Sequence, residues 1–227
     1  QGIAEIPVYA KPLVQIVTTG DEQVAPEAPL VPGEIYNSNA PMLQSAVQEI
    51  GAMGATSHAV DDRETLESVL RDAFATADLV AIAGGVSVGE RDYVKEVLSE
   101  LGVVTDFWRV KEKPGKPFVY GHHPDGTPVF GLPGNPVSAF VTFHLFVKPV
   151  IRGLLGNQGS ALGQRFVEAT AEEVMENRGD RPHYLRGVSQ GGKVKLSGTL
   201  QSLAIFGLSQ ANCLVRLEPE HTVSEGE

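Results

Sequence analysis

The chain has little of several residue types, and each scarcity excludes a class of function. Its 227 residues include one cysteine, Cys213, one tryptophan and three methionines. A single cysteine can form neither an intrachain disulfide nor a thiolate metal site, and its apolar neighbours predict a small core residue on a strand. Basic residues are also scarce, because 18 Lys and Arg against 28 Asp and Glu give a formal net charge of −10. This balance argues against a nucleic-acid-binding protein with a broad basic face.

The chain also lacks a long uninterrupted apolar run. The longest, residues 137–151, is broken by His144 and Lys148 and is too short to span a bilayer. Residues 1–5 contain neither the basic nor the apolar region of a signal peptide. We therefore expect a cytoplasmic protein with no membrane partner. Hydrophobic residues, at 42%, are sufficient for a well-packed core.

A glycine-rich segment follows one short apolar run. Residues 79–83 are continuously apolar, the pattern of a strand that is buried on both faces. Gly84 and Gly85 then allow positive φ and a close ligand approach, and Asp92 begins a predicted helix over 92–101. A strand, a glycine loop and a helix N-terminus together form an anion site, and an acid there also suits a divalent cation. The alternative is a tight turn followed by an acid that the helix dipole favours.

Two other predicted strands end in a similar way. The largely apolar residues 14–17 are followed at 18–22 by two hydroxyls, a glycine and two acids. Residues 130–132 are followed by the segment 133–138, in which Pro136 suits the first position of a helix. Because the carboxyl ends of parallel strands meet at one edge of a sheet, we expect the three segments to form one crevice.

A local cluster of basic residues lies between these motifs. Arg109, Lys111, Lys113 and Lys116 fall within eight positions. On an extended segment the first three side chains point to the same side. One interpretation is a solvated edge strand that discourages further pairing. We favour phosphate or oxyanion binding, because the prolines and glycine of residues 114–117 stiffen a loop at this point.

Strand and helix patterns alternate from residue 13, which predicts an α/β fold with a mostly parallel sheet and helices on both faces. The predicted strands are 13–18, 56–60, 79–83, 103–111, 117–120 and 128–131, and the predicted helices are 42–50, 63–75, 92–101 and 136–155. Short strand patterns and a glycine turn at 191–192 then predict a small all-β domain. We divide the chain into an α/β domain, 1–156, and a β domain, 157–227.

Five motifs together resemble molybdopterin molybdenumtransferase, the family called MoeA in bacteria and found as the E domain of gephyrin-like proteins. They are Thr19-Gly20-Asp21-Glu22, residues 35–39, residues 84–93, Lys113-Pro114-Gly115-Lys116-Pro117 and residues 132–138. The resemblance covers essentially the whole chain. It implies a MogA-like three-layer domain that binds molybdopterin, followed by a β-barrel-like domain. It also implies that two preceding domains of the family are missing here.

The family resemblance implies that molybdate is inserted into adenylylated molybdopterin with Mg²⁺-dependent release of AMP. The implied metal ligands are Asp21, Glu22, Asp61 and Asp92, and the implied catalytic residues are Asp61, Asp92 and Lys113. Hard carboxylate oxygens suit Mg²⁺, which neutralises charge on a phosphoryl group as it is cleaved. Without the resemblance, the acids at 61 and 62 would be interpreted as a strand-to-helix cap.

Matching the motifs by position also gives the remaining site residues. The implied substrate-binding residues are Thr19, Gly20, Gly84, Gly85, Ser87, Arg109, Lys116, Pro133, Asn135 and Ser138. Arg186 and Ser202 match positions associated with molybdate, although Gln201 stands where the family has a glycine. For an arginine on a strand, the alternative is a surface salt bridge.

The resemblance further implies a homodimer in full-length members and contact with a molybdopterin adenylyltransferase. Two other functions stay open. The chain could bind the nucleotide or pterin without turnover, because family members complete the active site with residues from the N-terminal region of a dimer partner. It could instead be a molybdopterin adenylyltransferase, although residues 84–87 and the predicted β domain argue against this.

Overall fold

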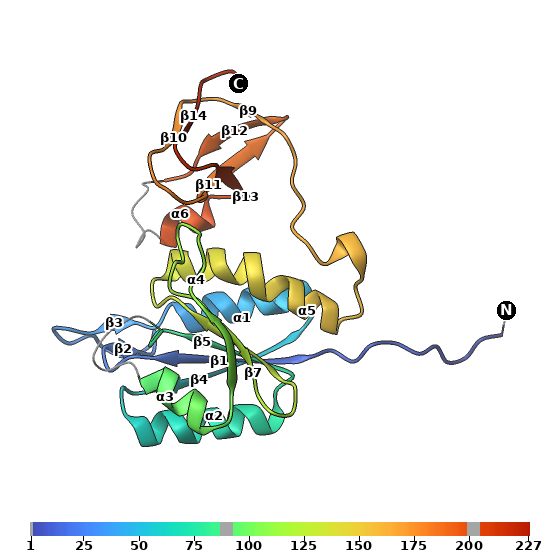
Figure 1. Cartoon of the computed structure of the whole chain (residues 1–227), viewed down its shortest axis with the longest axis vertical. Helices are drawn as coiled ribbons and strands as arrows, with labels where there is room; N and C mark the ends of the chain where they lie inside the picture. Colours follow the sequence, from blue (N-terminus) through green and yellow to red (C-terminus); the bar gives the residue numbers. More distant parts are fainter. Residues whose placement is uncertain (1, 87–92, 199–204) are drawn as a thin grey trace.

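The computed structural model describes residues 2–86, 93–198 and 205–227. Its largest element is a six-stranded sheet at the centre of the lower body in Figure 1. In order across the sheet, the strands are β4 (Met53–Ala59), β1 (Leu13–Thr19), β5 (Leu79–Ala83), β8 (Pro128–Leu132), β7 (Val119–His122) and β6 (Val104–Trp108). The first four are parallel, whereas β7 and β6 pair in antiparallel fashion. The prediction of a mostly parallel sheet is therefore confirmed.

Helices cover both faces of this sheet (Figure 1). One face carries α1 (Asn39–Ile50), α4 (Pro136–Thr142), the π-helical segment η1 (Phe143–Val147) and α5 (Lys148–Leu154). The other face carries α2 (Arg63–Thr76) and α3 (Tyr93–Glu100). All five residues of β5 are buried, because alternate side chains enter the two cores. Covering on both faces explains why this strand is apolar throughout.

The continuous helical run Pro136–Leu154 is a core helix of the α/β domain. By length and composition it is the one helix among the described residues that could cross a membrane, with a hydropathy of 1.3. Its side chains at Phe143, Val147 and Ile151 are nevertheless fully buried against the sheet. The apolar character of the run therefore reflects its place in the core of the domain.

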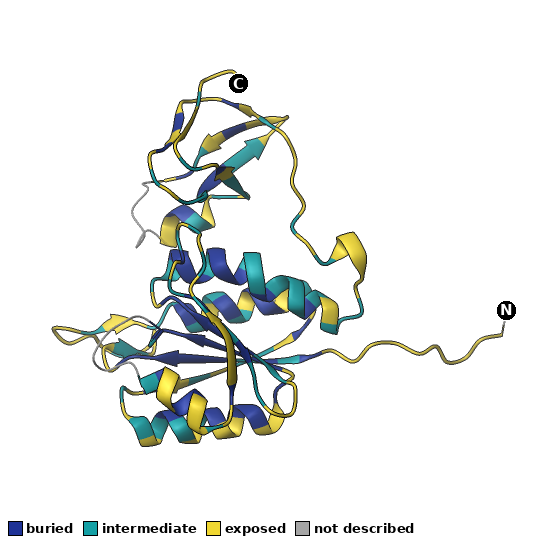
Figure 2. Ribbon diagram, viewed as in Figure 1, coloured by how far each residue is buried: buried dark blue, intermediate teal, exposed yellow. Residues whose placement is uncertain are grey.

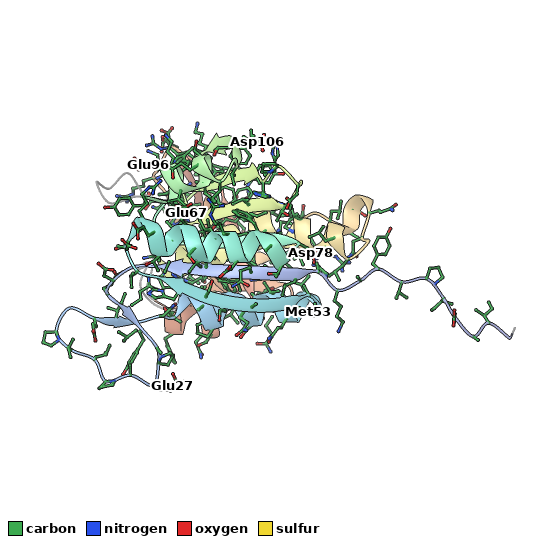
Figure 3. All side chains as sticks on the ribbon, turned by 90° about the horizontal axis from the view of Figure 1, so that it is seen from below. Glu27, Met53, Glu67, Asp78, Glu96 and Asp106 are labelled. Atoms are coloured by element: carbon green, nitrogen blue, oxygen red, sulfur yellow. The ribbon has the colours of Figure 1, made fainter. Side chains whose placement is uncertain are left out.

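A narrow arm leaves the sheet after β1. It contains the short strands β2 (Gln23–Val24) and β3 (Ile35–Tyr36), which pair with each other, and an exposed loop between them. Glu27, in that loop, lies well away from the body in Figure 3. The same view shows Glu67 of α2, Glu96 of α3 and Asp106 of β6 on separate elements, so acidic charge is spread over this side.

The segment before β1 has a different character from the body. Residues 2–12 have no helix or strand and are exposed almost throughout. Figure 2 shows them as a long exposed segment, in contrast to the buried sheet.

The C-terminal part is small and contains mostly short strands. One sheet has the order β13 (Cys213–Leu217), β11 (His183–Gln190), β12 (Lys193–Leu196) and β9 (Thr170–Ala171), and a second pairs β10 (Met175–Asn177) with β14 (His221–Val223). The other elements are the 3-10 turn η2 (Gly159–Ala161) and the short helix α6 (Ile205–Ser209), which packs against α4. The predicted small β domain is confirmed, and it also contains this short helix. Its division from the α/β domain at residue 156 stays a prediction.

Cys213 lies beside the small core of this β domain. The core is formed by Ala171, Met175, Leu185, Val194 and Leu217. The half-buried thiol group packs against that core, and burial raises its pKa.

Candidate functional site

The carboxyl ends of β1, β5 and β8 meet at one edge of the sheet and border a cavity of about 570 Å³. Seven predicted substrate-binding residues line it: Thr19, Gly20, Gly84, Gly85, Pro133, Asn135 and Ser138. Two predicted acids, Glu22 and Asp61, also line it. Parallel strand order therefore brings three segments that are far apart in the sequence to one place. The individual roles of these residues stay predictions.

Other predicted site residues lie elsewhere. Asp21, Arg109, Lys113 and Lys116 are not part of the cavity wall. Ser87, Asp92 and Ser202 lie outside the described residues. The described wall contains hydroxyl, amide and carboxylate side chains together with apolar ones, and none of the predicted basic residues.

Gly84 allows the ends of β5 and β1 to approach closely. Its φ is +105°, and a Cβ at this position would lie 2.7 Å from Oγ1 and 2.9 Å from the carbonyl oxygen of Thr19. Its N–H donates to the carbonyl oxygen of Leu132 at the end of β8. The glycine therefore joins all three strand ends, and any larger residue would force them apart.

Two amide side chains fix the segments around this edge. Asn135 begins α4, and its Oδ1 accepts from the N–H groups of Val137 at 3.1 Å and Ser138 at 3.3 Å. Asn39 of α1 is buried, and its Nδ2 donates to the carbonyl oxygen of Gly134 at 2.7 Å. These contacts hold the 133–138 segment between the helices α1 and α4.

Several residues of the wall were not predicted as site residues. They are Gln23, Ile35, Tyr36, Ser38, Asn39, Val86, Pro117, Gly134 and Pro136. Residues 35–39 formed one of the five motifs. Its two asparagines, at 37 and 39, stand at the start of a helix, and they were the signal that could have identified this segment as part of the site. Asn37 donates to Thr18 Oγ1 at 2.7 Å and accepts from the N–H of Ala40. The motif thereby connects the arm, β1 and α1.

The paired acids after β4 have separate positions. Asp62 is the N-cap of α2, and its Oδ2 accepts from the N–H and from the hydroxyl group of Thr65. These hydrogen bonds lower the pKa of Asp62. Asp61 instead lines the cavity, and its N–H donates to Asp21 Oδ1 at 2.8 Å. The cap interpretation is therefore right for Asp62, whereas Asp61 lines the cavity.

These acids suit Mg²⁺ as part of a larger ligand set. The described residues contain no group of three or more His, Cys, Asp or Glu that could hold a metal ion. They do place the carboxylates of Glu22 and Asp61 at one cavity, with Asp21 bonded to the backbone of Asp61. Mg²⁺ characteristically takes one or two protein carboxylates together with substrate phosphates and waters, so this donor set fits the ion.

The predicted strand over 103–111 is confirmed as β6 (Val104–Trp108), but the prediction that it continues through the basic residues to 111 is wrong. The strand β6 ends at Trp108, and Arg109 has a φ of 122°, so residues 109–116 form a loop. Arg109 N–H donates to the carbonyl oxygen of Phe118 at 2.7 Å, which closes the base of the loop. Farther along, Gly115 is packed so closely against α4 that a Cβ would lie 2.3 Å from Thr142 Cγ2. The basic side chains are therefore not aligned on one side of a strand.

Arg186 lies on β11 and is 4% exposed, so it is not the surface arginine of the alternative interpretation. Burial lowers its pKa. A Cβ on Gly207 of α6 would lie 3.0 Å from Arg186 Nη1, and Ser197 Oγ donates to the carbonyl oxygen of Gly207 at 3.1 Å. The glycine therefore leaves room for a guanidinium group that is enclosed between β11 and α6.

The comparisons with known proteins agree with this architecture. A family model described as "Probable molybdopterin binding domain" matches residues 15–153. The molybdopterin molybdenumtransferase of Haemophilus influenzae is 35% identical over 233 residues, which covers 100% of this chain and 57% of that protein. The chain belongs to the MoeA family of molybdopterin molybdenumtransferases. Its match with such a relative includes the β domain as well as the α/β domain.

Other MoeA relatives give the same result. Molybdopterin molybdenumtransferase 2 of Mycobacterium tuberculosis is 36% identical, over 98% of this chain and 56% of that protein. The crystal structure of the molybdopterin biosynthesis MoeA protein of Pyrococcus horikosii has a TM-score of 0.82 at 31% identity, over 96% of this chain and 53% of that one. The chain therefore spans little more than half the length of these MoeA relatives.

Proposed function

We propose that this chain binds adenylylated molybdopterin in the cavity at the ends of β1, β5 and β8 and contributes to molybdate insertion with release of AMP. The observation that carries the proposal is the cavity itself, which three strand ends of a molybdopterin binding domain enclose. We further propose a cytoplasmic location, a homodimer in the full-length protein and contact with a molybdopterin adenylyltransferase. These follow from the family resemblance.

In the proposed reaction, the chain binds and orients the substrate. The hydroxyl groups of Thr19 and Ser138 and the backbone at Gly84 and Gly85 form a wall suited to phosphate oxygens. Glu22 and Asp61 would hold Mg²⁺, which would supply positive charge to stabilise the phosphate group. Lys113 adds charge from the loop 109–116 at the edge of the site. Arg186, in the β domain, is the proposed contact for molybdate.

The second candidate function is binding without turnover. The observation that favours it is length, since the chain spans 57% of the Haemophilus influenzae relative. Positioning of the reacting groups can account for roughly 7–11 kcal/mol of catalysis, so an incomplete active site would lose part of that contribution. The two functions share the cavity and differ in turnover.

We expect this chain to form molybdenum cofactor from adenylylated molybdopterin and molybdate at least about tenfold more slowly than a version extended at its N-terminus. The assay compares the two proteins at equal concentration and follows cofactor formation and AMP release. Binding of AMP by both is the control. Equal rates would show that residues 1–227 contain the whole active site.

We expect Asp61→Asn to weaken Mg²⁺-dependent AMP binding by about tenfold or more, because one metal-binding carboxylate is lost. Calorimetric titration with and without Mg²⁺ measures the effect. Asp62→Asn is the matched control, and it keeps the cap because asparagine and aspartate cap helices about equally well. If both variants bound Mg²⁺ and AMP like the wild type, Asp61 would not be a metal ligand.

A further inference from the structure

The tip of the 109–116 loop is attached to the β domain. At the base of the loop, the N–H of Arg109 donates to the carbonyl oxygen of Phe118, and the N–H of Val110 donates to that of Lys116. At the tip, the N–H of Lys113 donates to the carbonyl oxygen of Pro182 at 2.9 Å. The N–H of Tyr184 donates back to the carbonyl oxygen of Lys113 at 2.7 Å. Lys113 therefore pairs with β11 like one residue of an added strand.

Arg181 adds a side-chain contact to the same tip. Its Nη1 donates to the carbonyl oxygen of Glu112 at 2.9 Å, and its side chain is 27% exposed. The backbone of Arg181 is itself held, because the buried Asn177 donates Nδ2 to its carbonyl oxygen at 2.8 Å. Asn177 also donates to the carbonyl oxygens of Leu217 and Glu218. Arg181 thus connects the loop to a turn that is fixed on the β domain.

Beyond Lys113, the 109–116 loop passes beside a residue of the cavity wall. Gly115, two residues after Lys113, would place a Cβ 3.9 Å from the carbonyl oxygen of Ser138, which lines the cavity. On the other side, His183 is bridged to Lys113. Burial and the charges of Lys113 and Arg181 lower the pKa of His183 to about 4, so it is neutral at pH 7. Lys113 and Arg181 are therefore positive charges beside a neutral His183, and Arg181 Nε also lies 3.6 Å from Asp180 Oδ1.

We propose that Arg181 is a positioning residue, which holds Lys113 at the edge of the cavity so that Lys113 can bind the anionic substrate. The β domain would in this way complete the substrate site of the α/β domain. The inference rests on the proposed function, because it takes Lys113 as a substrate contact. Arg181 acts through the Glu112 carbonyl group and needs no contact with the substrate.

The test is a double-mutant cycle with Mg²⁺ and AMP as the probe. Affinity is measured by calorimetry for the wild type, Lys113→Ala, Arg181→Met and the double variant. Methionine keeps the aliphatic packing of arginine and removes the donor. We expect each single change to weaken binding by about tenfold and the double variant to bind like Lys113→Ala alone. A general structural role of Arg181 would weaken binding equally in both backgrounds.

Two further variants complete the design. Arg178→Met removes a charge from the same segment, but this side chain is 84% exposed and pairs with Glu176, so binding should match the wild type. Arg181→Lys keeps a charged donor and should restore most of the affinity. If Arg181→Met fails to fold, Arg181→Lys still tests the proposal. An Arg181→Lys protein that binds Mg²⁺ and AMP as weakly as Lys113→Ala would contradict the positioning role.

The remaining outcomes separate the two proposals. If the wild type does not bind the probe, the proposed function and the positioning role are both contradicted. If the wild type binds and Lys113→Ala has no effect, the cavity remains a nucleotide site and the positioning role is wrong. If the losses of binding free energy from the two single changes add in the double variant, the positioning role is wrong and the proposed function stands. The same conclusion follows if Arg181→Met binds the probe like the wild type.

Discussion

Lowering the pH from 7 to 4 is expected to destabilise this chain through His144, by roughly 3 kcal/mol at about 1.4 kcal/mol per pKa unit. Burial and the charges of Lys148 and Arg152 lower the pKa of His144 from 6.5 to about 4. Its Nε2 atom is buried and has no hydrogen-bond partner among the described residues. Its ring packs against the ring of Phe140 in a tilted arrangement, with the ring centroids 4.2 Å apart. The native environment therefore accepts the neutral ring and disfavours the charged one.

The direction follows from which state binds the proton. Above pH 6.5, His144 is neutral in both folded and unfolded chains, and its ionisation has no effect on stability. Between 6.5 and about 4, only the unfolded chain takes up the proton, so the free energy of unfolding falls as the pH falls. His183, with its pKa lowered to about 4, adds to the same trend. Below that range both states are protonated and the loss levels off.

Urea unfolding of the wild type and of His144→Leu at several pH values between 4 and 7 measures this effect. The leucine variant should show a clearly smaller fall in the free energy of unfolding, with the remaining fall due in part to His183. Replacement of the exposed His221 by glutamine is the control and should keep the wild-type slope. An unchanged slope in His144→Leu would show that His144 is not responsible.

The sheet and its strand ends could be predicted because their physical signals are local. The run 79–83 is apolar at every position, and all five residues of β5 are buried. Asn135 and Pro136 mark the start of α4 in the sequence, and the structure has the helix begin there. Since parallel strands align their carboxyl ends, the meeting of three such segments follows from fold class alone.

The parts that could not be predicted depend on contacts between distant segments. Residues 109–111 were predicted to continue a strand, but packing of Gly115 on α4 and pairing of Lys113 with β11 hold the 109–116 segment as a loop. Arg186 could be placed on a strand but its enclosure could not, because it depends on a glycine at 207. Likewise, without the family resemblance the local sequence did not distinguish Asp61 from Asp62, since either could cap α2.

Gly134→Val is expected to weaken binding of Mg²⁺ and AMP by roughly 30-fold or more, because it adds a branched side chain to the cavity wall. Gly134 is exposed and lines the cavity. Its φ is not in the left-handed region, and a Cβ there would meet only Gly84 Cα, at 3.6 Å. The fold should therefore tolerate the valine. The loss of affinity should come from the space that the valine side chain takes up in the cavity. The measurement is a titration followed by NMR.

The matched control is Gly163→Val. Gly163 is also exposed and has an ordinary φ, and a Cβ there would have no atom within 4 Å. It lies between η2 and β9, outside the cavity wall. This variant should bind like the wild type, and both valine variants should keep the wild-type unfolding midpoint.

If the proposed function is right, the anionic substrate binds where β1, β5 and β8 end. The most direct measurement is a titration of the ¹⁵N-labelled chain with Mg²⁺ and AMP, in which each backbone amide resonance reports on its own surroundings. We expect saturable shifts at Thr19, Gly84 and Ser138, which weaken in Gly134→Val and persist in Gly163→Val. An absence of shifts at these three amides in the wild type, or equal titrations of the two variants, would contradict it.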